Sequence, residues 1–527
     1  MSTGKLIVAA TVVLLSAGCG SKGGSAAESA DESTTDSVVA PAPEPVAWLP
    51  DTVYPSADAV KFVVEYVGDS ATGALSSLQD LYADTPGAFT FRKGQHRDAS
   101  FGGTVSGTPS EITVDWEFTT AYDTTRTKFG VWGGGSGWTG QPLLVDWPDS
   151  CASRFRAGAL VNDSFAGKEI IVGSLCGNVY FLNPESGAPT RTPINAGNPI
   201  KGTVSLDPTL NGNLYVGQGI PANKPFGAVV VDLYKNAVSH VFPEDAKAWR
   251  GWGAYDSSPV RVGQFLFRPG ENGSVYKFNV GSGSLALHSV LRYRVAGSAP
   301  GIEASMAVWR NYGFVCDNHG NIIAFNLDNM RPVWHYTLGD DIDSTPALCV
   351  EDGKAYIYTG CEIDRQGSGT AKYVKINALN GEAVWNTAIE GNRADVGGKH
   401  FDGGYYASAL PGTGNCSHLI YNNCVLNTDS MQNGIFVAFE RSTGRIAYKT
   451  PLKYYAWSSP VGFLNENGEM FVLTLDAAGR AYLINGIDGS IIATRQVGAN
   501  FESSPVVWDN HVAVGSRGRS IYRMSIK

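Results

Sequence analysis

The chain has 527 residues, of which 43% are hydrophobic and only 17% are charged, so it can bury a large core and its bulk is not disordered. A formal net charge of −9, without any block of Lys and Arg, argues against nucleic acid as a partner. The 63 Gly and 26 Pro indicate a turn-rich folded chain rather than a low-complexity one.

The N-terminus has the form of a secretory signal peptide. Lys5 precedes an apolar run, Leu6 to Leu15, and small residues and then Cys19 follow it. The run is too short for a membrane-spanning helix, which needs about 20 apolar residues. We therefore predict a cleaved signal peptide over residues 1–18.

The residues before Cys19 resemble the bacterial lipoprotein cleavage box, although Ser16 stands where that family usually has an aliphatic residue. The resemblance implies that Cys19 becomes the lipidated first residue; ordinary secretion, with Cys19 incidental, is the alternative. Residues 19–46 are rich in Ser, Ala, acidic residues and Pro, a composition typical of a flexible tether. The prediction is a folded body held close to a membrane of the bacterial cell envelope.

Residues 47–110 match no repeat in the rest of the chain. The run from Ala59 to Val67 has the composition of a strand. A segment of about 60 residues makes only a marginal core by itself. We expect it to pack on the domain that follows.

A repeated pattern occupies residues 111–527. Its most regular part is a group of small residues, such as Ser-Ser-Pro, that leads into an apolar strand at intervals of 40 to 63 residues, which suits one four-stranded sheet per repeat. An eighth copy is expected at residues 137–142. The central residues of the other seven copies are Thr203, Ser258, Ser305, Thr345, Ser408, Ser459 and Ser504.

Two further parts of the repeat predict a strand and a turn. A Gly opens an alternating run that ends on Asn, as in Gly177 to Asn183, and a second Gly follows four residues later. In three repeats an aromatic residue stands four positions after the turn Gly or its equivalent, and we expect it to pack between neighbouring sheets. These aromatic residues are Trp334, Trp385 and Tyr448.

The last repeat has room for only three strands, whereas residues 112–118 form a strand-like run just before the first repeat. Pairing these two segments would leave no long open edge. The sequence therefore predicts an all-β fold, an eight-bladed β-propeller of four-stranded antiparallel blades that an N-terminal strand closes.

The combined pattern resembles the pyrroloquinoline-quinone-like propeller repeat, most closely in Val514 to Gly518 and in Asn377 to Trp385. With the cleavage box, the chain is similar to the propeller lipoproteins of outer-membrane assembly, which implies a scaffold role in β-barrel insertion. A quinone-dependent dehydrogenase is a weaker alternative. That resemblance would imply a disulfide between adjacent cysteines and a calcium-ligand set, and neither is found in the sequence.

No known catalytic motif, metal motif or cofactor motif is present, so we expect a non-enzymatic monomer that binds a protein or a glycan. The main alternative is a carbohydrate-binding or carbohydrate-degrading surface lipoprotein. Its ligand would contact aromatic residues before the inner strands and a His on a long insertion; these residues could instead only plug the central channel. The candidates are Trp138, Trp252, Tyr255, His400, Tyr405, Tyr406, Tyr455 and Trp457.

Seven cysteines remain besides Cys19, and an exported chain permits disulfides. Cys416 and Cys424 are the closest pair in sequence and lie across an expected hairpin. They are the predicted disulfide. The predicted location is the cell envelope, with the chain anchored to the outer membrane and facing the periplasm or the exterior.

Overall fold

The computed structural model describes residues 46–99, 102–396, 399–428 and 432–527. The predicted signal peptide, the lipidation of Cys19 and nearly all of the tether lie outside these residues. No helix within the described ranges is long and apolar enough to cross a lipid bilayer.

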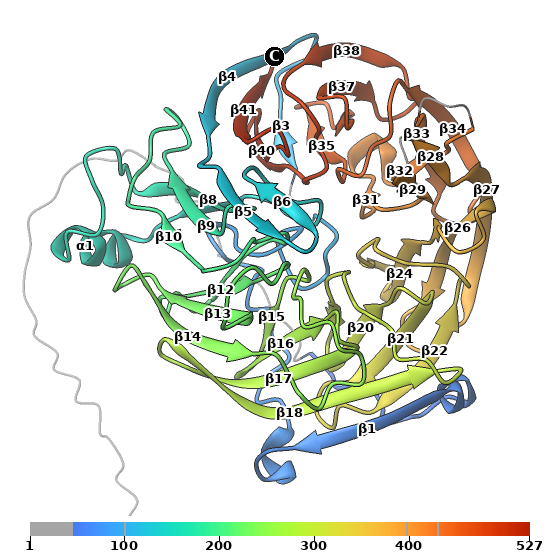
Figure 1. Ribbon diagram of the computed structural model, residues 1–527. Helices are drawn as coiled ribbons and strands as arrows, with labels where there is room; N and C mark the ends of the chain where they lie inside the picture. The colour runs from blue at the N-terminus through green and yellow to red at the C-terminus, as the bar shows by residue number, and fades with distance from the viewer. Residues whose placement is uncertain (1–45, 100–101, 397–398, 429–431) are drawn as a thin grey trace, which may run out of the picture. The chain divides into compact units, whose positions relative to one another are not determined.

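Residues 46–527 form one compact unit of antiparallel sheets arranged around a central axis (Figure 1). In the described part of the chain these sheets make eight four-stranded blades, as predicted. Blade 1 consists of β7 (Leu143–Asp146), β8 (Lys168–Gly173), β9 (Asn178–Leu182) and β10 (Ile194–Asn195), and blade 2 of β11 (Ser205–Leu206), β12 (Asn213–Gly217), β13 (Gly227–Asp232) and β14 (Ala237–Pro243). Blade 3 consists of β15 (Val260–Val262), β16 (Phe265–Gly270), β17 (Ser274–Gly281) and β18 (Ser284–Val295). Blade 4 consists of β19 (Ala307–Trp309), β20 (Tyr312–Cys316), β21 (Asn321–Asn326) and β22 (Pro332–Thr337). Blade 5 consists of β23 (Ala347–Glu351), β24 (Lys354–Gly360), β26 (Ser368–Asn377) and β27 (Ala383–Asn392), and blade 6 of β31 (Leu410–Pro411), β32 (Leu419–Val425), β33 (Gly434–Glu440) and β34 (Ile446–Leu452). Blade 7 consists of β35 (Val461–Leu464), β36 (Met470–Leu475), β37 (Arg480–Asn485) and β38 (Ile491–Gln496). Blade 8 consists of β39 (Val506–Trp508), β40 (His511–Gly515), β41 (Ser520–Ile526) and β4 (Ile112–Thr119).

The small-residue entries link neighbouring blades at the axis. The amide of Ser258 donates to the hydroxyl oxygen of Ser305 (2.8 Å), and the amide of Ser305 donates to that of Thr345 (2.9 Å). The amide of Ser408 donates in the same way to Ser459 (2.9 Å), and that of Ser459 to Ser504 (3.1 Å). These contacts explain why the repeat requires a hydroxyl residue at its centre, because each one satisfies a buried backbone donor of the preceding blade.

The repeated aromatic residues pack between neighbouring blades, as predicted. The Trp334 indole N–H donates to a backbone carbonyl of the next blade (3.0 Å), and its ring lies over Gly381. Gly381 has a φ of +76°, and a Cβ atom there would lie 2.7 Å from the Trp334 ring. The turn Gly is therefore required by its own conformation and by the ring that covers it.

The ring closes where the sequence predicts. β4 pairs antiparallel with β41, from Ile112 opposite Ile526 to Thr119 opposite Ser520. Trp116 of β4 also donates to the carbonyl of Pro184 in blade 1 (2.9 Å) and covers a turn Gly there. β4 thus supplies both the missing strand of blade 8 and the aromatic contact to the next blade.

Residues before β4 contact several blades. β1 (Val60–Tyr66) adds a fifth strand to the outside of blade 3. Short strands β2 (Gly87–Ala88) and β3 (Gly103–Thr104) pair with the inner strands of blades 1 and 7. The 3-10 helices η1 (Pro55–Ala59) and η2 (Ser70–Gly73) flank β1.

Between β2 and β3, two buried arginines join the inner strands of different blades. Arg97 donates to the backbone carbonyls of Met306 (2.9 Å) and Ser258 (3.1 Å), which belong to blades 4 and 3. Arg92 donates to those of Pro460 (2.9 Å) and Ala409, which belong to blades 7 and 6. This segment is a plug that crosses the propeller axis.

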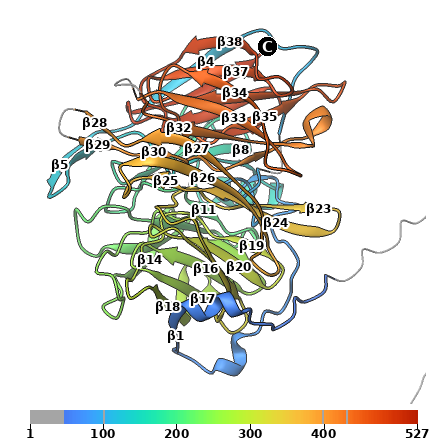
Figure 2. The ribbon, with the colours of Figure 1, turned by 90° about the vertical axis from the view of Figure 1, so that its right-hand side faces the viewer.

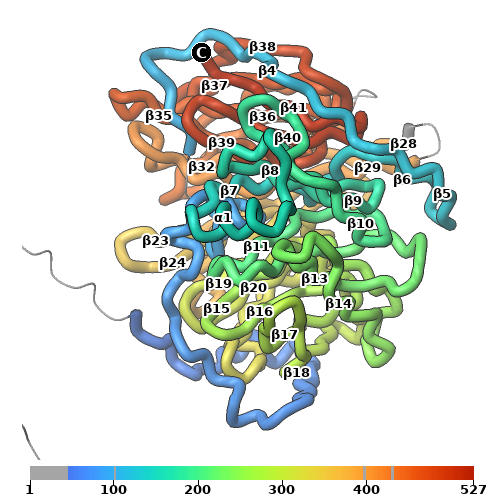
Figure 3. Tube along the Cα trace, turned by 90° about the vertical axis from the view of Figure 1, so that its left-hand side faces the viewer, coloured from blue at the N-terminus to red at the C-terminus, as the bar shows by residue number. Residues whose placement is uncertain are grey.

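The two faces of the propeller carry different insertions. Hairpins β5–β6 (Asp123–Thr127 and Gly130–Gly133) and β28–β29 (Ala394–Val396 and Lys399–Phe401) extend from one face (Figures 2 and 3). β23 and β24 project on the opposite side in both views. The remaining insertions are α1 (Asp149–Ala157) in blade 1, η3 (Gly414–Cys416) in blade 6, and β25 (Glu362–Ile363) with β30 (Gly403–Gly404), which extend the blade 6 sheet.

Candidate functional site

One side chain from each of seven blades occupies the same position in the repeat, two residues before the centre of the entry. Because every entry approaches the axis in the same way, these side chains surround one end of the axis. Asp343, Tyr406 and Trp457 line a narrow axial cavity there, with Trp138 of the eighth entry and the hydroxyl residues of five blades. We call this end of the axis the funnel. The seven residues are Lys201, Asp256, Glu303, Asp343, Tyr406, Trp457 and Glu502.

The plug limits the funnel on the inner side. Phe91 precedes Arg92 in the chain and contributes to the lining of the axial cavity. Arg92 and Arg97 are 1% and 0% exposed, and burial lowers the pKa of each to about 10, so both remain cationic near neutral pH. The funnel therefore opens to one face only.

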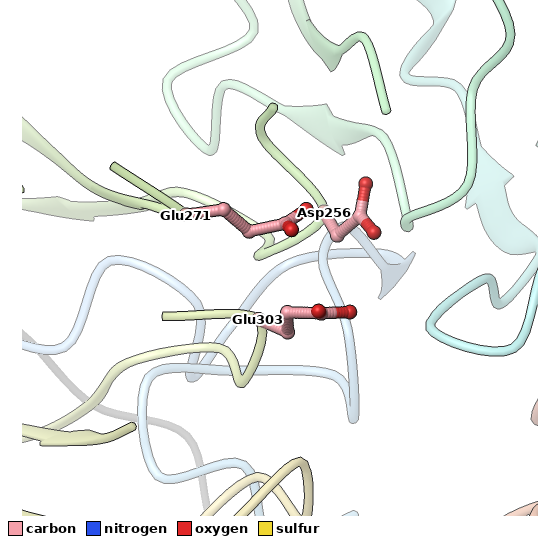
Figure 4. A group of neighbouring side chains, drawn as sticks. All are labelled: Asp256, Glu271 and Glu303. Carbon is pink, nitrogen blue, oxygen red and sulfur yellow. The ribbon is translucent and has the colours of Figure 1, made fainter. Parts of the chain in front are cut away.

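The first carboxylate group, which we call the lysine trio, consists of Asp256, Glu271 and Glu303. Figure 4 shows these three side chains on separate stretches of the chain, with their carboxylates close together. The Lys201 ammonium contacts Asp256 and lies 3.8 Å from a carboxylate oxygen of each of the other two. It also lies 4.2 Å from the centroid of the Trp138 ring, where the π-face attracts a cation.

Charge and burial set the protonation of the lysine trio. Burial would lower the pKa of Lys201, but the three carboxylates raise it above its ordinary value, so the ammonium form is retained. Burial, followed by repulsion from Glu303, raises the pKa of Glu271. Glu271 also accepts a hydrogen bond from the indole N–H of Trp252 (2.7 Å). A side chain of the protein thus offsets part of the charge of this trio.

The second carboxylate group, which we call the open trio, consists of Asp341, Asp343 and Glu362. Its ligand atoms lie within 4.8 Å of one another, as in the lysine trio. Burial, followed by the neighbouring carboxylates, raises the pKa of all three groups. Among the residues that the structure describes, no Lys, Arg or His forms an ion pair with any of these three.

Backbone contacts position the open trio. The amide of Glu362 donates to the carbonyl of Asp341 (2.8 Å). Asp340 accepts hydrogen bonds from the amides of Asp341 (2.9 Å), Asp364 (3.2 Å) and Arg365 (3.1 Å). The loop before β23 and the loop after β24 are therefore held together, and their acidic side chains meet at the axis.

Four of the aromatic residues that the sequence predicted lie at or beside the funnel. The rings of Tyr406 and Trp457 stack with their centroids 4.4 Å apart, and Trp138 contacts Trp457 edge-on at 6.3 Å. Tyr455 packs on the other side of this pair, 5.1 Å from Trp457. Trp252 lies further out, where it contacts Phe129 of hairpin β5–β6.

The other three predicted lining residues do not line the cavity. Tyr255 and Tyr405 are both 0% exposed and pack against Tyr276 and Tyr373 inside the blades, so they are core residues. His400 is exposed on hairpin β28–β29 and contacts Asp395 of the same hairpin.

The predicted disulfide between Cys416 and Cys424 is not formed, and both thiols are free. Cys416 packs among Leu410, Leu419 and Met470, whereas Cys424 packs in a different cluster with Tyr405. The two thiols are held in separate parts of the core, and short separation in sequence does not bring them together.

The carboxylates of the two trios are not among the site residues that the sequence predicts. Three of them, Asp256, Glu303 and Asp343, stand two residues before an entry centre. The residue type at this position differs from blade to blade, so the position does not stand out as a repeated residue. Glu271 directly follows β16, the second strand of blade 3, and Glu362 begins β25, two residues after the second strand of blade 5.

These features define the class of protein: a closed eight-bladed propeller with the pyrroloquinoline-quinone-like repeat fold. No family model and no curated relative matches the chain. Solved structures do. They include the quinohemoprotein alcohol dehydrogenase from Comamonas testosteroni, with a TM-score of 0.57 and 12% identity over 84% of this chain and 81% of that one.

Two further solved structures resemble parts or most of the chain. One is a europium-containing methanol dehydrogenase, with a TM-score of 0.53 and 11% identity over 85% of this chain and 99% of that one. The other is BamB from Moraxella catarrhalis, with a TM-score of 0.45 and 17% identity over 68% of this chain and 92% of that one. Their function is not transferred by fold at these identities.

The funnel does not fit pyrroloquinoline quinone. That cofactor is a planar tricarboxylate, whereas the funnel presents carboxylates of its own and the stacked rings of Tyr406 and Trp457. Lys201, the cation beside them, is already bound to the lysine trio. A cofactor of the same charge would be repelled.

Proposed function

We propose that the chain is a lipid-anchored, non-enzymatic binding propeller of the bacterial cell envelope that presents the funnel face to a partner protein. A scaffold role in outer-membrane protein assembly is the specific form of this proposal. The signal peptide, the cleavage box at Cys19 and the tether in the sequence support the anchor.

The observation that carries the proposal is the concentration of carboxylates at one end of the axis. The two trios place six carboxylates there, and among the described residues the Lys201 ammonium forms ion pairs with the lysine trio only. The partly exposed members of the two trios, Glu303, Asp341 and Asp343, would favour a basic group on a partner. Hairpins β5–β6 and β28–β29 would extend the contact area on that face.

The test is photo-crosslinking in intact cells from one site on each face. A crosslinking amino acid at Phe129, exposed on hairpin β5–β6, is expected to capture a component of the barrel-assembly machinery. The matched control is Val350, which is equally exposed on β23 at the opposite side, and capture there should be absent. Equal capture from both sites, or none from a well-expressed chain, would contradict the proposal.

Carbohydrate binding is the second candidate, and one observation favours it. Trp138, Tyr406 and Trp457 place aromatic rings beside carboxylates at the axial cavity, and sugars commonly stack on such rings. A broad glycan array separates the two candidates: the protein-scaffold reading expects no bound glycan.

A further inference from the structure

The open trio and the lysine trio each contain three carboxylates, but only the lysine trio is paired with a cation. Each brings three carboxylates within 4.8 Å of one another near the axis. In the lysine trio, Lys201 lies within 3.8 Å of all three. In the open trio, no cation of the described residues lies within ion-pair distance; the Arg365 guanidinium donates to the carbonyl of Asn318 (2.6 Å) and acts on Asp341 only through its charge.

Glu362 provides a second observation that points to a ligand. Its side chain is 3% exposed, and its Oε1 atom has no hydrogen-bond partner among the described residues. The hydroxyl of Tyr406 hydrogen-bonds the same carboxyl group. A buried carboxylate oxygen without a donor is costly, and here it is directed at two further carboxylates.

We propose that Asp341, Asp343 and Glu362 form a binding site for a divalent cation of the calcium type. The donors are all hard oxygens, which select Ca²⁺ or Mg²⁺ over softer metals. Ca²⁺ is the better fit because it accepts six to eight ligands in irregular geometry, so three carboxylates can be completed by water and the Tyr406 hydroxyl. The cation would compensate the negative charge of the open trio, as the Lys201 ammonium compensates part of the charge of the lysine trio.

This inference goes beyond the proposed function and does not depend on it, because it names an inorganic ligand and no partner. Its test is isothermal titration calorimetry, in which CaCl₂ is added to the chelator-treated full-length protein. A parallel titration with TbCl₃ is followed by luminescence. Terbium luminescence shows where the ion binds as well as that it binds, because Tyr406 and the Trp457 ring stacked on it can transfer excitation energy to an ion bound beside them. We expect one saturable Ca²⁺ site, Ca²⁺-displaceable terbium emission, and weaker binding of Mg²⁺.

Two matched variants locate the site. Glu362→Gln keeps the shape of the side chain and should weaken Ca²⁺ binding at least tenfold and abolish the terbium signal. Glu271→Gln makes the same change in the lysine trio and should leave both unchanged. Circular dichroism confirms that each variant is folded. Asp343→Asn gives an independent loss-of-binding variant if Glu362→Gln does not fold.

Two results would overturn the inference. One is the absence of Ca²⁺ and terbium binding by the folded parent, which would mean that protons neutralise the open trio. The other is equal binding by the parent, Glu362→Gln and Asp343→Asn, which would place the cation elsewhere. Equal loss in Glu271→Gln and Glu362→Gln would also contradict it, because the trios would then act as one diffuse acidic surface.

Discussion

At the scale of residues, one register position carries different chemistry in each blade. Asp256 and Asp343 occupy equivalent positions, yet the first contacts Lys201 and the second faces other carboxylates. The Ser and Thr residues beside them were predictable from the sequence because their structural role repeats. The charged residues were not, since each is needed only once around the ring.

Asp317 gives a prediction about pH. It is fully buried, and burial raises its pKa from an ordinary 3.8 to about 6, although Asn321, the His319 amide and Tyr293 donate hydrogen bonds to it. Below about pH 4 the group is protonated in both the native and unfolded states. Between pH 4 and 6 the unfolded state loses the proton first, so the native state loses up to about 3 kcal/mol of stability as pH rises.

The Asp317→Asn variant checks this prediction. Its amide oxygen can accept the same backbone hydrogen bonds without a charge, so the variant should lack this part of the pH dependence. The measurement is the free energy of unfolding by guanidinium chloride from pH 4 to 7, in buffer with chelator. Parallel curves for the parent and Asp317→Asn would show the expectation to be wrong.

At the scale of elements, the repeat predicted the strands well and the insertions poorly. Each entry centre stands two residues before an inner strand, as Ser258 does before β15 and Ser459 before β35. Helix α1 was missed, although Cys151, Ala152 and Phe155 form its buried face and show helical spacing. Hairpins β5–β6 and β28–β29 contribute little to a repeated core, so no pattern of apolar residues marks them.

The hydroxyl contacts between entries predict a measurable contribution to stability. Ser459→Ala removes the acceptor of the Ser408 amide and leaves a buried N–H without its partner. We expect a loss of about 1–3 kcal/mol in the free energy of unfolding. The control is Ser442→Ala, at an exposed position, which should change stability by less than about 0.5 kcal/mol. A similar small effect for both variants would rule out a role for the ring of hydroxyls.

At the scale of the whole molecule, the N-terminal segment and the propeller depend on each other. The eight blades and their closure by β4 could be predicted because the repeat count leaves one strand missing. The plug could not, since Arg92 and Arg97 lie in a segment without a repeat and act only when four blades surround them. The boundary of the N-terminal segment at residue 110 remains a prediction.

Replacement of Arg97 tests the plug. Arg97→Met keeps the length of the side chain but leaves the carbonyls of Met306 and Ser258 without their donor. We expect a loss of about 3 kcal/mol or more and a lower melting temperature. Arg126→Met, on exposed hairpin β5–β6, is the matched control and should melt with the parent. Identical melting of all three proteins would contradict a structural role for the plug.

The pairing of β4 with β41 has a consequence for biogenesis. Thr120 and Arg519, at one end of this pairing, are 399 positions apart in a chain of 527 residues, so the ribosome synthesises most of the chain between them. A polypeptide crossing a membrane N-terminus first therefore carries an unfinished blade throughout its passage. The export proposed for this chain would then require release from the translocation channel before blade 8 is complete.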